Sequence, residues 1–446
     1  MKTVNRREPW ILFVGDVLVW LFALWLTLLI RFGEAPIWST YHEHLVPFSI
    51  LSIFWIITYF ISGLYDKQTR LFRRSLPSLL FNTQLFNSAL AVVFFYFVPF
   101  FGITPKTILF VYLIISSLLI FFWRTFGQGT FGVRKSEKTI IVGQGQELID
   151  LAEEIKSNSR YGLDLVGTVN LSADFNLAAL IDLIKKTEAV VLVIDFNNKY
   201  FSKELSSLYN LLFSDVRFLD FTNLYEQVFD CLPVLSLNYD WFLQNVSHQS
   251  DGVYDLIKRL MDFIFALVFG LISLIFYPLV ILAIKLDDRG PIFIQQERVG
   301  QNNSLIRIYK FRSMSFNDDE NPVMALNNKI TKVGKFLRNS RLDELPQLWN
   351  VLTGDLSLVG PRPELPNLVK KYEQQIPYYQ VRHLLKPGLS GWAQIYHDNH
   401  PHRGLNIEET KNKLSYDLFY LKNRSLWLDL QVVLKTIKTL LSRVGR

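Results

Sequence analysis

The sequence predicts a membrane α-helical bundle, a cytoplasmic α/β Rossmann-like domain and an α-rich, membrane-associated domain with a re-entrant helix. Three observations lead to this prediction. Long uncharged apolar segments occupy the start of the chain, short apolar runs alternate with helical patterns in the middle, and an apolar segment interrupted by a proline precedes the remainder. We expect the three domains to cover residues 1–135, 136–245 and 246–446.

The bundle is predicted from hydropathy. Half of the 446 residues are hydrophobic and the mean hydropathy is +0.19, which is more apolar than a typical soluble protein. Four nearly uncharged segments are long enough to cross a hydrocarbon core about 30 Å thick, and no small-residue cleavage site follows the first. We predict transmembrane helices at Trp10–Ile30, Leu45–Leu64, Leu79–Phe101 and Thr107–Trp123.

Lysine and arginine flank these segments unevenly. They cluster before the first segment, between the second and third, and after the fourth, whereas the other two loops carry only Arg31 and Lys106 near helix ends. Because such residues are enriched on the cytoplasmic side, both ends of the bundle and everything after it should face the cytoplasm. The clustered cations are Lys2, Arg6, Arg7, Lys67, Arg70, Arg73, Arg74, Arg124, Arg134, Lys135 and Lys138.

The net charge of +7 does not indicate a nucleic-acid partner. Many of the cations lie beside apolar segments, where anionic lipid head groups account for them, and no nucleic-acid-binding motif is recognisable. Cys231 is the only cysteine, so the chain has no internal disulfide. We expect Cys231 to be a buried structural thiol rather than a nucleophile.

The middle of the chain has the alternating pattern of a parallel α/β domain. Strands are predicted at Lys138–Gly143, Leu165–Val169, Ala189–Ile194 and Val216–Leu219, and helices at Gln146–Lys156, Leu177–Lys186 and Phe201–Phe213.

A dinucleotide-binding fold would place phosphate-binding glycines at the first strand-to-helix turn, where Gly143 and Gly145 lie. Leu148 stands in place of the third glycine, and Asn170 in place of the acidic residue that holds a ribose. We therefore favour a degenerate Rossmann-like domain, used for regulation or dimerisation, over an intact NAD site.

A fifth apolar segment, Leu260–Ile284, has charges at both ends and contains Pro278, which should bend the helix. A simple span would place the following residues across the membrane from the α/β domain. A re-entrant helix with its kink at Pro278 keeps both on the cytoplasmic side, and an ordinary fifth span is the alternative that hydropathy favours.

Residues 285–395 contain a dense series of short motifs. Singly, each has a structural explanation, such as a helix cap, a strand-surface charge or a rigid turn. In order, the motif residues are Lys285, Asp287, Asp288, Gly290 and Pro291; Arg298; Lys310 and Arg312; Arg338; Asp343 and Glu344; Pro361-Arg362-Pro363; and Lys386 to Ile395.

The adjacent carboxylates Asp343 and Glu344 suit chemistry on a phosphate. Because Pro346 fits a helix only in its first turn, a helix should begin near Asp343 or Glu344. Free N–H groups at that end would keep Asp343 ionised and would attract a phosphate. Carboxylate and phosphate repel each other, so bidentate arginines and a hard cation such as Mg²⁺ should separate them.

The order and spacing of the motifs resemble the bacterial sugar transferase family, the monotopic phosphoglycosyl transferases. The resemblance covers residues 255–446. The N-terminal bundle and the degenerate Rossmann-like (CoA-binding-like) domain resemble the long, multi-domain branch of that family, whose members are polyprenyl-phosphate hexose-1-phosphate transferases.

The resemblance implies a two-step transfer at the bacterial inner membrane that begins synthesis of exopolysaccharide, capsule or O antigen. The carboxylate of Asp343 attacks the β-phosphorus of a UDP-sugar, UMP leaves, and undecaprenyl phosphate then takes the phosphosugar from the enzyme. Mg²⁺ is implied near Asp343 and Glu344. Phosphate oxygens are implied to bind to Arg338, Arg362, Lys310, Arg312 and Arg298.

Three features leave alternatives open. Tyr277 precedes Pro278 where the family often has Ser-Pro. His397, His400 and His402 could bind zinc, but a fourth ligand is missing and a substrate-facing loop is favoured. The Leu426–Leu441 segment has helical apolar spacing, which suits a helix at the membrane interface or one packed on the core.

Two other functions fit parts of the sequence. An NAD-dependent sugar-nucleotide dehydratase or epimerase could use Tyr254 and Lys258 as a Tyr-x-x-x-Lys pair, but the glycine motif is defective. A non-catalytic scaffold of a polysaccharide export complex would not need Asp343. The sugar is not identifiable, and a homodimer through the middle domain is a further expectation.

Overall fold

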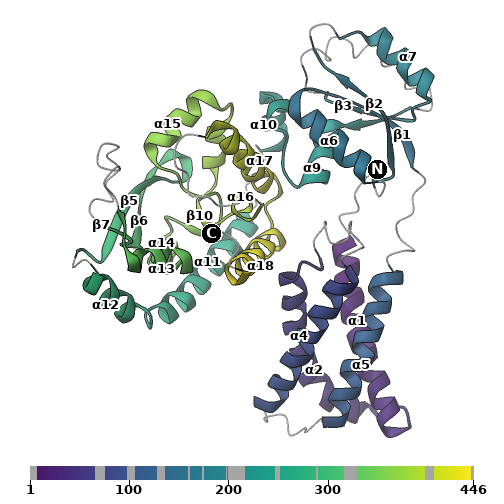
Figure 1. Ribbon diagram of the computed structural model, residues 1–446, viewed down its shortest axis with the longest axis vertical. Helices are drawn as coiled ribbons and strands as arrows, with labels where there is room; N and C mark the ends of the chain where they lie inside the picture. Colours follow the sequence, from purple (N-terminus) through teal and green to yellow (C-terminus); the bar gives the residue numbers. More distant parts are fainter. Residues whose placement is uncertain are drawn as a thin grey trace. The chain divides into compact units, whose positions relative to one another are not determined.

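The structure is a computed structural model in which the chain divides into two compact units, Met1–Val228 and Phe229–Arg446, and each is described by itself (Figure 1). The described residues are 8–65, 76–97, 106–127, 136–158, 161–172, 175–196, 198, 216–246, 252–287, 290–315, 329–396 and 406–442.

Four long apolar helices begin the first unit (Figure 1). They are long and apolar enough to cross a membrane, which confirms the four predicted segments. Their bounds are α1 Glu8–Phe32, α2 Trp38–Ile61, α4 Leu76–Phe97 and α5 Lys106–Phe122, and a π-helical turn, Trp123–Gly127, extends α5.

A charged pair lies inside this bundle. Arg124 and Asp16 are fully buried and form an ion pair in which the Arg124 Nε donates to Asp16 Oδ1 at 3.0 Å. The Tyr65 hydroxyl donates to Asp16 Oδ2 at 2.7 Å. Arg124 was counted among the cations flanking the membrane, but its charge is neutralised within the protein rather than by lipid head groups.

The rest of the first unit is built on a four-stranded parallel sheet in the order β2-β1-β3-β4 (Figure 1). All four predicted strands are confirmed, and the predicted helix at 201–213 lies outside the described residues. The bounds are β1 Glu137–Gly143, α6 Gly145–Ser157, β2 Leu163–Asn170, α7 Leu177–Thr187, β3 Val191–Ile194, β4 Arg217–Asp220 and α9 Phe221–Phe229.

The two glycines of the first strand-to-helix turn have structural explanations. A Cβ added to Gly143 would lie 3.0 Å from the ring of Phe221, so Gly143 lets this buried ring pack at the end of β1. Gly145 begins α6 with a φ of 69°, a conformation that favours glycine. Neither glycine needs a bound phosphate to account for it.

The second unit is rich in helices and contains three two-stranded sheets, β5-β6, β7-β8 and β9-β10. Its elements are η7 Val234–Ser236, α10 Tyr239–Asn245, α11 Gly252–Ser273, α12 Tyr277–Asp287, β5 Phe293–Val299, η8 Gln301–Asn303, β6 Leu305–Phe311, β7 Met314–Ser315, β8 Lys329–Ile330, α13 Lys332–Ser340, η10 Leu342–Glu344, α14 Gln347–Thr353, β9 Ser357–Val359, α15 Pro366–Gln375, η11 Tyr379–Leu384, β10 Gly388–Ser390, α16 Trp392–Tyr396, α17 Ile407–Asn423 and α18 Leu426–Ser442.

The main core of this unit includes residues that the sequence analysis placed at the end of the α/β domain. Leu232, Leu237, Trp241 and Phe242 are buried in one hydrophobic cluster with residues of α15, α17 and α18. The neighbouring Cys231 is also buried, as predicted for a structural thiol. Residues 229–246 therefore pack with the chemical motifs that follow them.

The predicted fifth apolar segment forms two helices, α11 and α12, bent by 57°. The break occupies residues 274–276, just before Pro278, which is the second residue of α12. The missing N–H of a proline is tolerated in a first helical turn, so the bend precedes Pro278 instead of falling at it. Within the last turn of α11, the Ser273 hydroxyl donates to the Gly270 carbonyl at 2.6 Å.

The last helix, α18, confirms the helical prediction for residues 426–441. Leu428, Val432 and Leu434 are buried, whereas Val433 and Ile437 are exposed. The helix therefore packs on the core with one side, which confirms the core-packing alternative, and has exposed apolar residues on another side. A position at the membrane interface stays a prediction.

Candidate active site

The adjacent carboxylates lie on a short 3₁₀ turn, η10, between α13 and α14. The preceding Arg341 has a φ of 58°, a conformation that is costly for a residue with a side chain and is common at functional sites. The prediction that a helix begins at Asp343 or Glu344 is wrong. Pro346 has no N–H to donate to Leu342, and α14 begins only at Gln347.

Three cations surround the Glu344 carboxylate. Arg362 Nη2 donates to Glu344 Oε1 at 3.2 Å, Lys310 Nζ lies 3.7 Å from the same oxygen, and Arg341 Nη1 lies 3.5 Å from Oε2. Burial opposes ionisation of Glu344, but these three charges outweigh it and lower its pKa to about 2. Glu344 is therefore a fixed negative charge that gathers basic groups.

Asp343 has the opposite environment. Its side chain is buried, with an exposed fraction of 8%, and its Oδ1 has no hydrogen-bond partner among the described residues. Burial, reinforced by the charge of Glu344, raises the pKa of Asp343 to about 6. We expected backbone N–H groups at a helix start to keep this carboxylate ionised. Desolvation raises its pKa instead of lowering it, yet with a pKa of about 6 the group is still mostly ionised near pH 7.

The other predicted phosphate ligands divide into two groups. The charge of Arg338 acts on Asp343, and its Nε donates to the Ser313 hydroxyl at 2.8 Å. Arg298 lies close enough to Lys310 that its charge helps burial to lower the pKa of that lysine. The Arg312 Nε donates to the Met314 carbonyl at 2.9 Å, a contact within its own loop.

The motif that begins in the last turn of α12 has mainly structural contacts. Lys285 Nζ donates to the Gly290 carbonyl at 3.0 Å, and the Asp287 carboxylate accepts the Val333 N–H at 3.1 Å, near the start of α13. A Cβ on Gly290 would overlap the Arg312 guanidinium, so this glycine makes room for the arginine. Pro291 is exposed, and Asp288 lies outside the described residues.

Sequence reasoning missed two residues that shape the site. Arg341 contacts Glu344, and its spacing three residues earlier could have indicated this. Arg382 donates to the Arg362 carbonyl at 3.1 Å and forms a buried ion pair with Asp417 at 2.7 Å. No local pattern links Arg382 to Arg362, so this support was not predictable.

The carboxylates fit a magnesium ion. Mg²⁺ keeps several waters and typically binds one or two protein carboxylates together with substrate phosphates. Asp343 and Glu344 are such a pair, and the unpartnered oxygen of Asp343 is available as a ligand. Within the described residues, no group of three or more His, Cys, Asp or Glu side chains could form an all-protein metal site. His397, His400 and His402 lie outside those residues.

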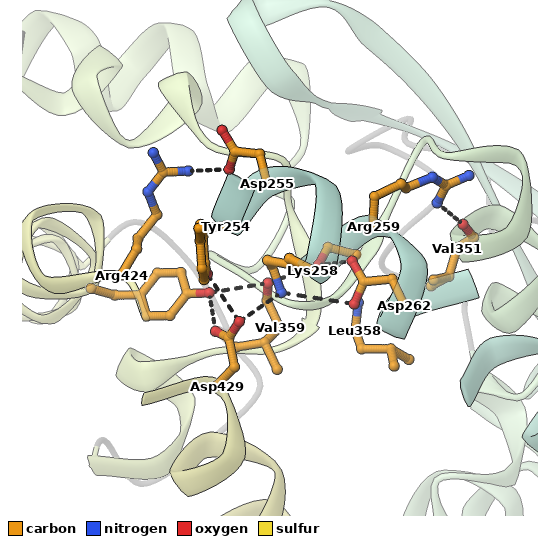
Figure 2. Close-up of polar contacts among 12 residues, drawn as sticks. Tyr254, Asp255, Lys258, Arg259, Asp262, Val351, Leu358, Val359, Arg424 and Asp429 are labelled. Atoms are coloured by element: carbon orange, nitrogen blue, oxygen red, sulfur yellow. Dashed lines mark hydrogen bonds and ion pairs between the residues drawn. The ribbon is translucent and has the colours of Figure 1, made fainter. Parts of the chain in front are cut away.

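The side chains of Tyr254 and Lys258 make structural contacts instead of forming the catalytic pair of a dehydratase or epimerase. The Tyr254 hydroxyl donates to Asp429 Oδ2 at 2.9 Å, and Lys258 Nζ lies 3.2 Å from the same atom (Figure 2). Both side chains therefore join α11 to α18.

Comparison with known proteins decides the family. Residues 253–443 match the bacterial sugar transferase family. The UDP-glucose:undecaprenyl-phosphate glucose-1-phosphate transferase of Caulobacter vibrioides is 38% identical over 199 residues, which are 42% of this chain and 71% of that protein. The chain belongs to the bacterial sugar transferase family.

Two other relatives show how much of this chain is similar to known proteins. The UDP-N-acetylgalactosamine-undecaprenyl-phosphate N-acetylgalactosaminephosphotransferase of Aeromonas hydrophila is 42% identical over 199 residues, 43% of this chain and 45% of that protein. The undecaprenyl-phosphate galactose phosphotransferase of Salmonella typhimurium is 29% identical over 344 residues, 69% of each chain. The match spans less than half the length of several relatives.

Proposed function

We propose that this sugar transferase moves a sugar 1-phosphate from a UDP-sugar to undecaprenyl phosphate and releases UMP. The observation that carries the proposal is the pair of neighbouring carboxylates with opposite environments, one buried with an unpartnered oxygen and one held among three cations. The names of the relatives from Aeromonas and Caulobacter each contain undecaprenyl phosphate and a UDP-sugar, UDP-N-acetylgalactosamine in the first and UDP-glucose in the second.

Asp343 is proposed as the nucleophile. Its carboxylate oxygen forms a bond to the β-phosphorus while the bond from that phosphorus to the bridging oxygen breaks and UMP leaves with the electron pair. An oxygen of undecaprenyl phosphate then attacks the same phosphorus and releases the carboxylate. A pKa of about 6 suits this role, because the group is mostly ionised near pH 7 yet more basic than an ordinary aspartate.

Glu344 is proposed to keep the basic side chains in place. Its three partners, Lys310, Arg341 and Arg362, can turn toward the phosphates when the substrate arrives, and Arg338 and Arg298 add charge nearby. We propose a weaker, structural contribution for Arg312. Asp343 and Glu344 would hold Mg²⁺, which when bound neutralises phosphate charge.

We propose that α11 and α12 form a re-entrant helix and that the catalytic domain faces the cytoplasm at the bacterial inner membrane. The distribution of lysine and arginine around the first four helices supports this orientation, and the 57° bend supports a helix that enters and returns. The proposed role is the first membrane step of exopolysaccharide, capsule or O-antigen synthesis.

For the remaining parts we propose a bundle, a Rossmann-like domain and a catalytic domain, with the Rossmann-like domain forming a homodimer. Packing explains the presence of Gly143, and backbone conformation explains that of Gly145. This supports a role for the domain other than nucleotide binding. Light scattering of the purified protein at several concentrations tests the dimer, and a monomer throughout contradicts it.

The activity is tested with the purified 446-residue chain, undecaprenyl phosphate, Mg²⁺ and a panel of UDP-sugars, with UMP release as the readout. We expect one or a few sugars to give UMP and Asp343→Asn to give none. Glu188→Gln, which removes an exposed ion pair with Lys138 in the α/β domain, serves as the control and should remain active. Unchanged UMP release by Asp343→Asn would rule out the proposed nucleophile.

A further inference from the structure

The helix that follows the two carboxylates, α14, is hydrogen-bonded to both arms of the bent pair. From α11, Arg259 donates Nη1 to the Val351 carbonyl at 2.6 Å (Figure 2) and Nη2 to the Leu352 carbonyl at 2.8 Å. From α12, the Tyr277 hydroxyl accepts the Trp349 Nε1–H at 3.0 Å. The two contacts join α14 to the helices on either side of the break.

The contact with Arg259 satisfies the end of α14. The last carbonyls of a helix lack partners within the helix, and a cation there also interacts favourably with the helix dipole. Gly354 ends α14 with a φ of 97°, and a Cβ on it would lie 3.2 Å from Arg259 Nη2. The glycine therefore both allows the turn and leaves room for the guanidinium.

The contact with Tyr277 lies directly beside the bend. Tyr277 is the first residue of α12, and its ring packs edge-on against Phe311 at 4.8 Å between centroids. The packed ring directs the hydroxyl to Trp349, so Tyr277 bonds the bend to α14.

The middle of α11 is itself bonded to the segment that leads to Arg362. Asp262 accepts the Leu358 N–H at 3.2 Å (Figure 2) and the Ser357 hydroxyl at 2.7 Å, both from β9. One turn earlier on the same face of α11, Lys258 lies 3.7 Å from Asp262 and 3.2 Å from Asp429. A shift of α11 would therefore disturb β9 and, four residues beyond Leu358, Arg362.

The middle of α14 is joined to the strand that carries Lys310. The Asn350 side chain accepts the Tyr309 N–H at 3.1 Å and donates to the Arg307 carbonyl at 2.8 Å. Because α14 begins three residues after Glu344, its position sets where the carboxylates lie relative to Lys310.

We propose that Arg259 and Tyr277 are positioning residues for the transfer reaction. By bonding α14 from the two arms of the bent pair, they hold Asp343 and Glu344 in register with Lys310 and Arg362. The inference rests on the proposed function, since it assumes that Asp343 attacks the phosphate.

The test compares Tyr277→Phe, Trp349→Phe and the double variant, with Arg259→Lys as a separate probe of the other arm. We expect each single variant to lose about tenfold in kcat, because small misplacements of catalytic groups cost up to about a hundredfold in rate. KM for the UDP-sugar should stay within about twofold, and the double variant should lose no more than either single one, because both remove the same bond.

The folded fraction of each variant separates positioning from simple loss of folded protein. A smaller folded fraction lowers kcat only in proportion to the folded protein, which thermal unfolding of each variant in detergent measures. Misplaced catalytic groups should instead keep kcat per folded molecule about tenfold lower in Tyr277→Phe and Arg259→Lys, with KM unchanged. If Trp349→Phe does not fold, these two variants carry the test.

Two matched controls should behave as the unsubstituted protein. Tyr239→Phe removes the hydroxyl of an exposed tyrosine on α10, and Asp255→Asn breaks the pair of Asp255 with Arg424 at the start of α11. Unchanged kcat in Tyr277→Phe and Arg259→Lys, or losses that multiply in the double variant, would overturn the inference. An active Asp343→Asn would instead overturn the proposed function.

Discussion

Asp343 and Glu344 are neighbours in the chain, yet their pKa values move in opposite directions. Burial raises that of Asp343 to about 6, whereas Arg362, Lys310 and Arg341 overcome burial and lower that of Glu344 to about 2. The difference arises because the 3₁₀ turn directs one side chain to the cations and leaves an oxygen of the other unpartnered. Such opposed environments assign different roles to two chemically similar groups.

The raised pKa of Asp343 predicts an acid limb in the activity. Below about pH 6 the carboxyl is protonated and cannot attack, so kcat/KM for the UDP-sugar should fall about tenfold per pH unit. This parameter reports the first half-reaction, in which the titrating lipid phosphate takes no part. A profile with its midpoint near 4 would mean that Asp343 is not desolvated as described.

Removing the charge of Glu344 should move that limb. After burial, the charge of Glu344 is the largest cause of the raised pKa of Asp343. Its loss also removes the carboxylate that pairs with three cations, so their charge acts on Asp343 alone. In Glu344→Gln we therefore expect lower activity and an acid limb shifted to lower pH, measured as the profile of kcat/KM. A limb shifted to higher pH would contradict the assigned electrostatics.

At the scale of elements, α13 approaches another segment so closely that only glycine fits. A Cβ on Gly334 would overlap the backbone of Ser313, the residue whose hydroxyl accepts a hydrogen bond from Arg338. Gly334→Ala should therefore destabilise the unit by roughly 1–3 kcal/mol, as overpacking does, and lower the melting temperature.

Gly252→Ala is the control for this substitution, because no atom of the described residues lies within 4 Å of a Cβ at the first residue of α11. It should leave thermal unfolding in detergent unchanged. Equal melting of the Gly334→Ala and Gly252→Ala variants would show that α13 can move away from Ser313 without cost.

Elements with a local pattern were predictable from the sequence. Most of the apolar helices, the strands β1 to β4 and the last helix lie within a few residues of their predicted bounds, because hydropathy and periodicity act over short stretches. The exception is α2, which begins at Trp38 instead of the predicted Leu45. The carboxylate pair and its basic neighbours were also singled out. The start of the helix was not predicted correctly. Pro346 has no N–H to donate, so it interrupts the helical hydrogen bonds, and α14 begins after it.

Contacts between distant segments could not be predicted. Arg382 supports the carbonyl of Arg362 from 20 residues away, and Trp349 meets Tyr277 across 72 residues. Neither pair has a spacing or composition that distinguishes it from ordinary core residues. Their partners follow from tertiary packing, which a single sequence does not reveal.

At the scale of the whole molecule, the second unit should fold without the first, provided that residues 229–246 are kept. Leu232, Leu237, Trp241 and Phe242 are buried in its core, and each large apolar side chain buried this way contributes roughly 1.5–3 kcal/mol. A chain of residues 246–446 should therefore melt lower, or aggregate more, than a chain of residues 229–446.

Thermal unfolding of both shortened chains in the same detergent checks this prediction, with UMP release as a second readout. Equal melting of the two would place residues 229–246 outside the folded unit. It would support the domain boundary at residue 245 that the sequence analysis expected.

The Asp16–Arg124 pair has a consequence for how the protein enters the membrane. The two residues are 108 positions apart, so the ribosome must make α1, α2, α4 and α5 before the arginine exists. An unpaired carboxylate is costly in lipid. We expect α1 to stay near the surface during synthesis, which crosslinking of chains arrested before and after residue 124 would detect. The bundle would then assemble as one cooperative insertion event that its final helix completes.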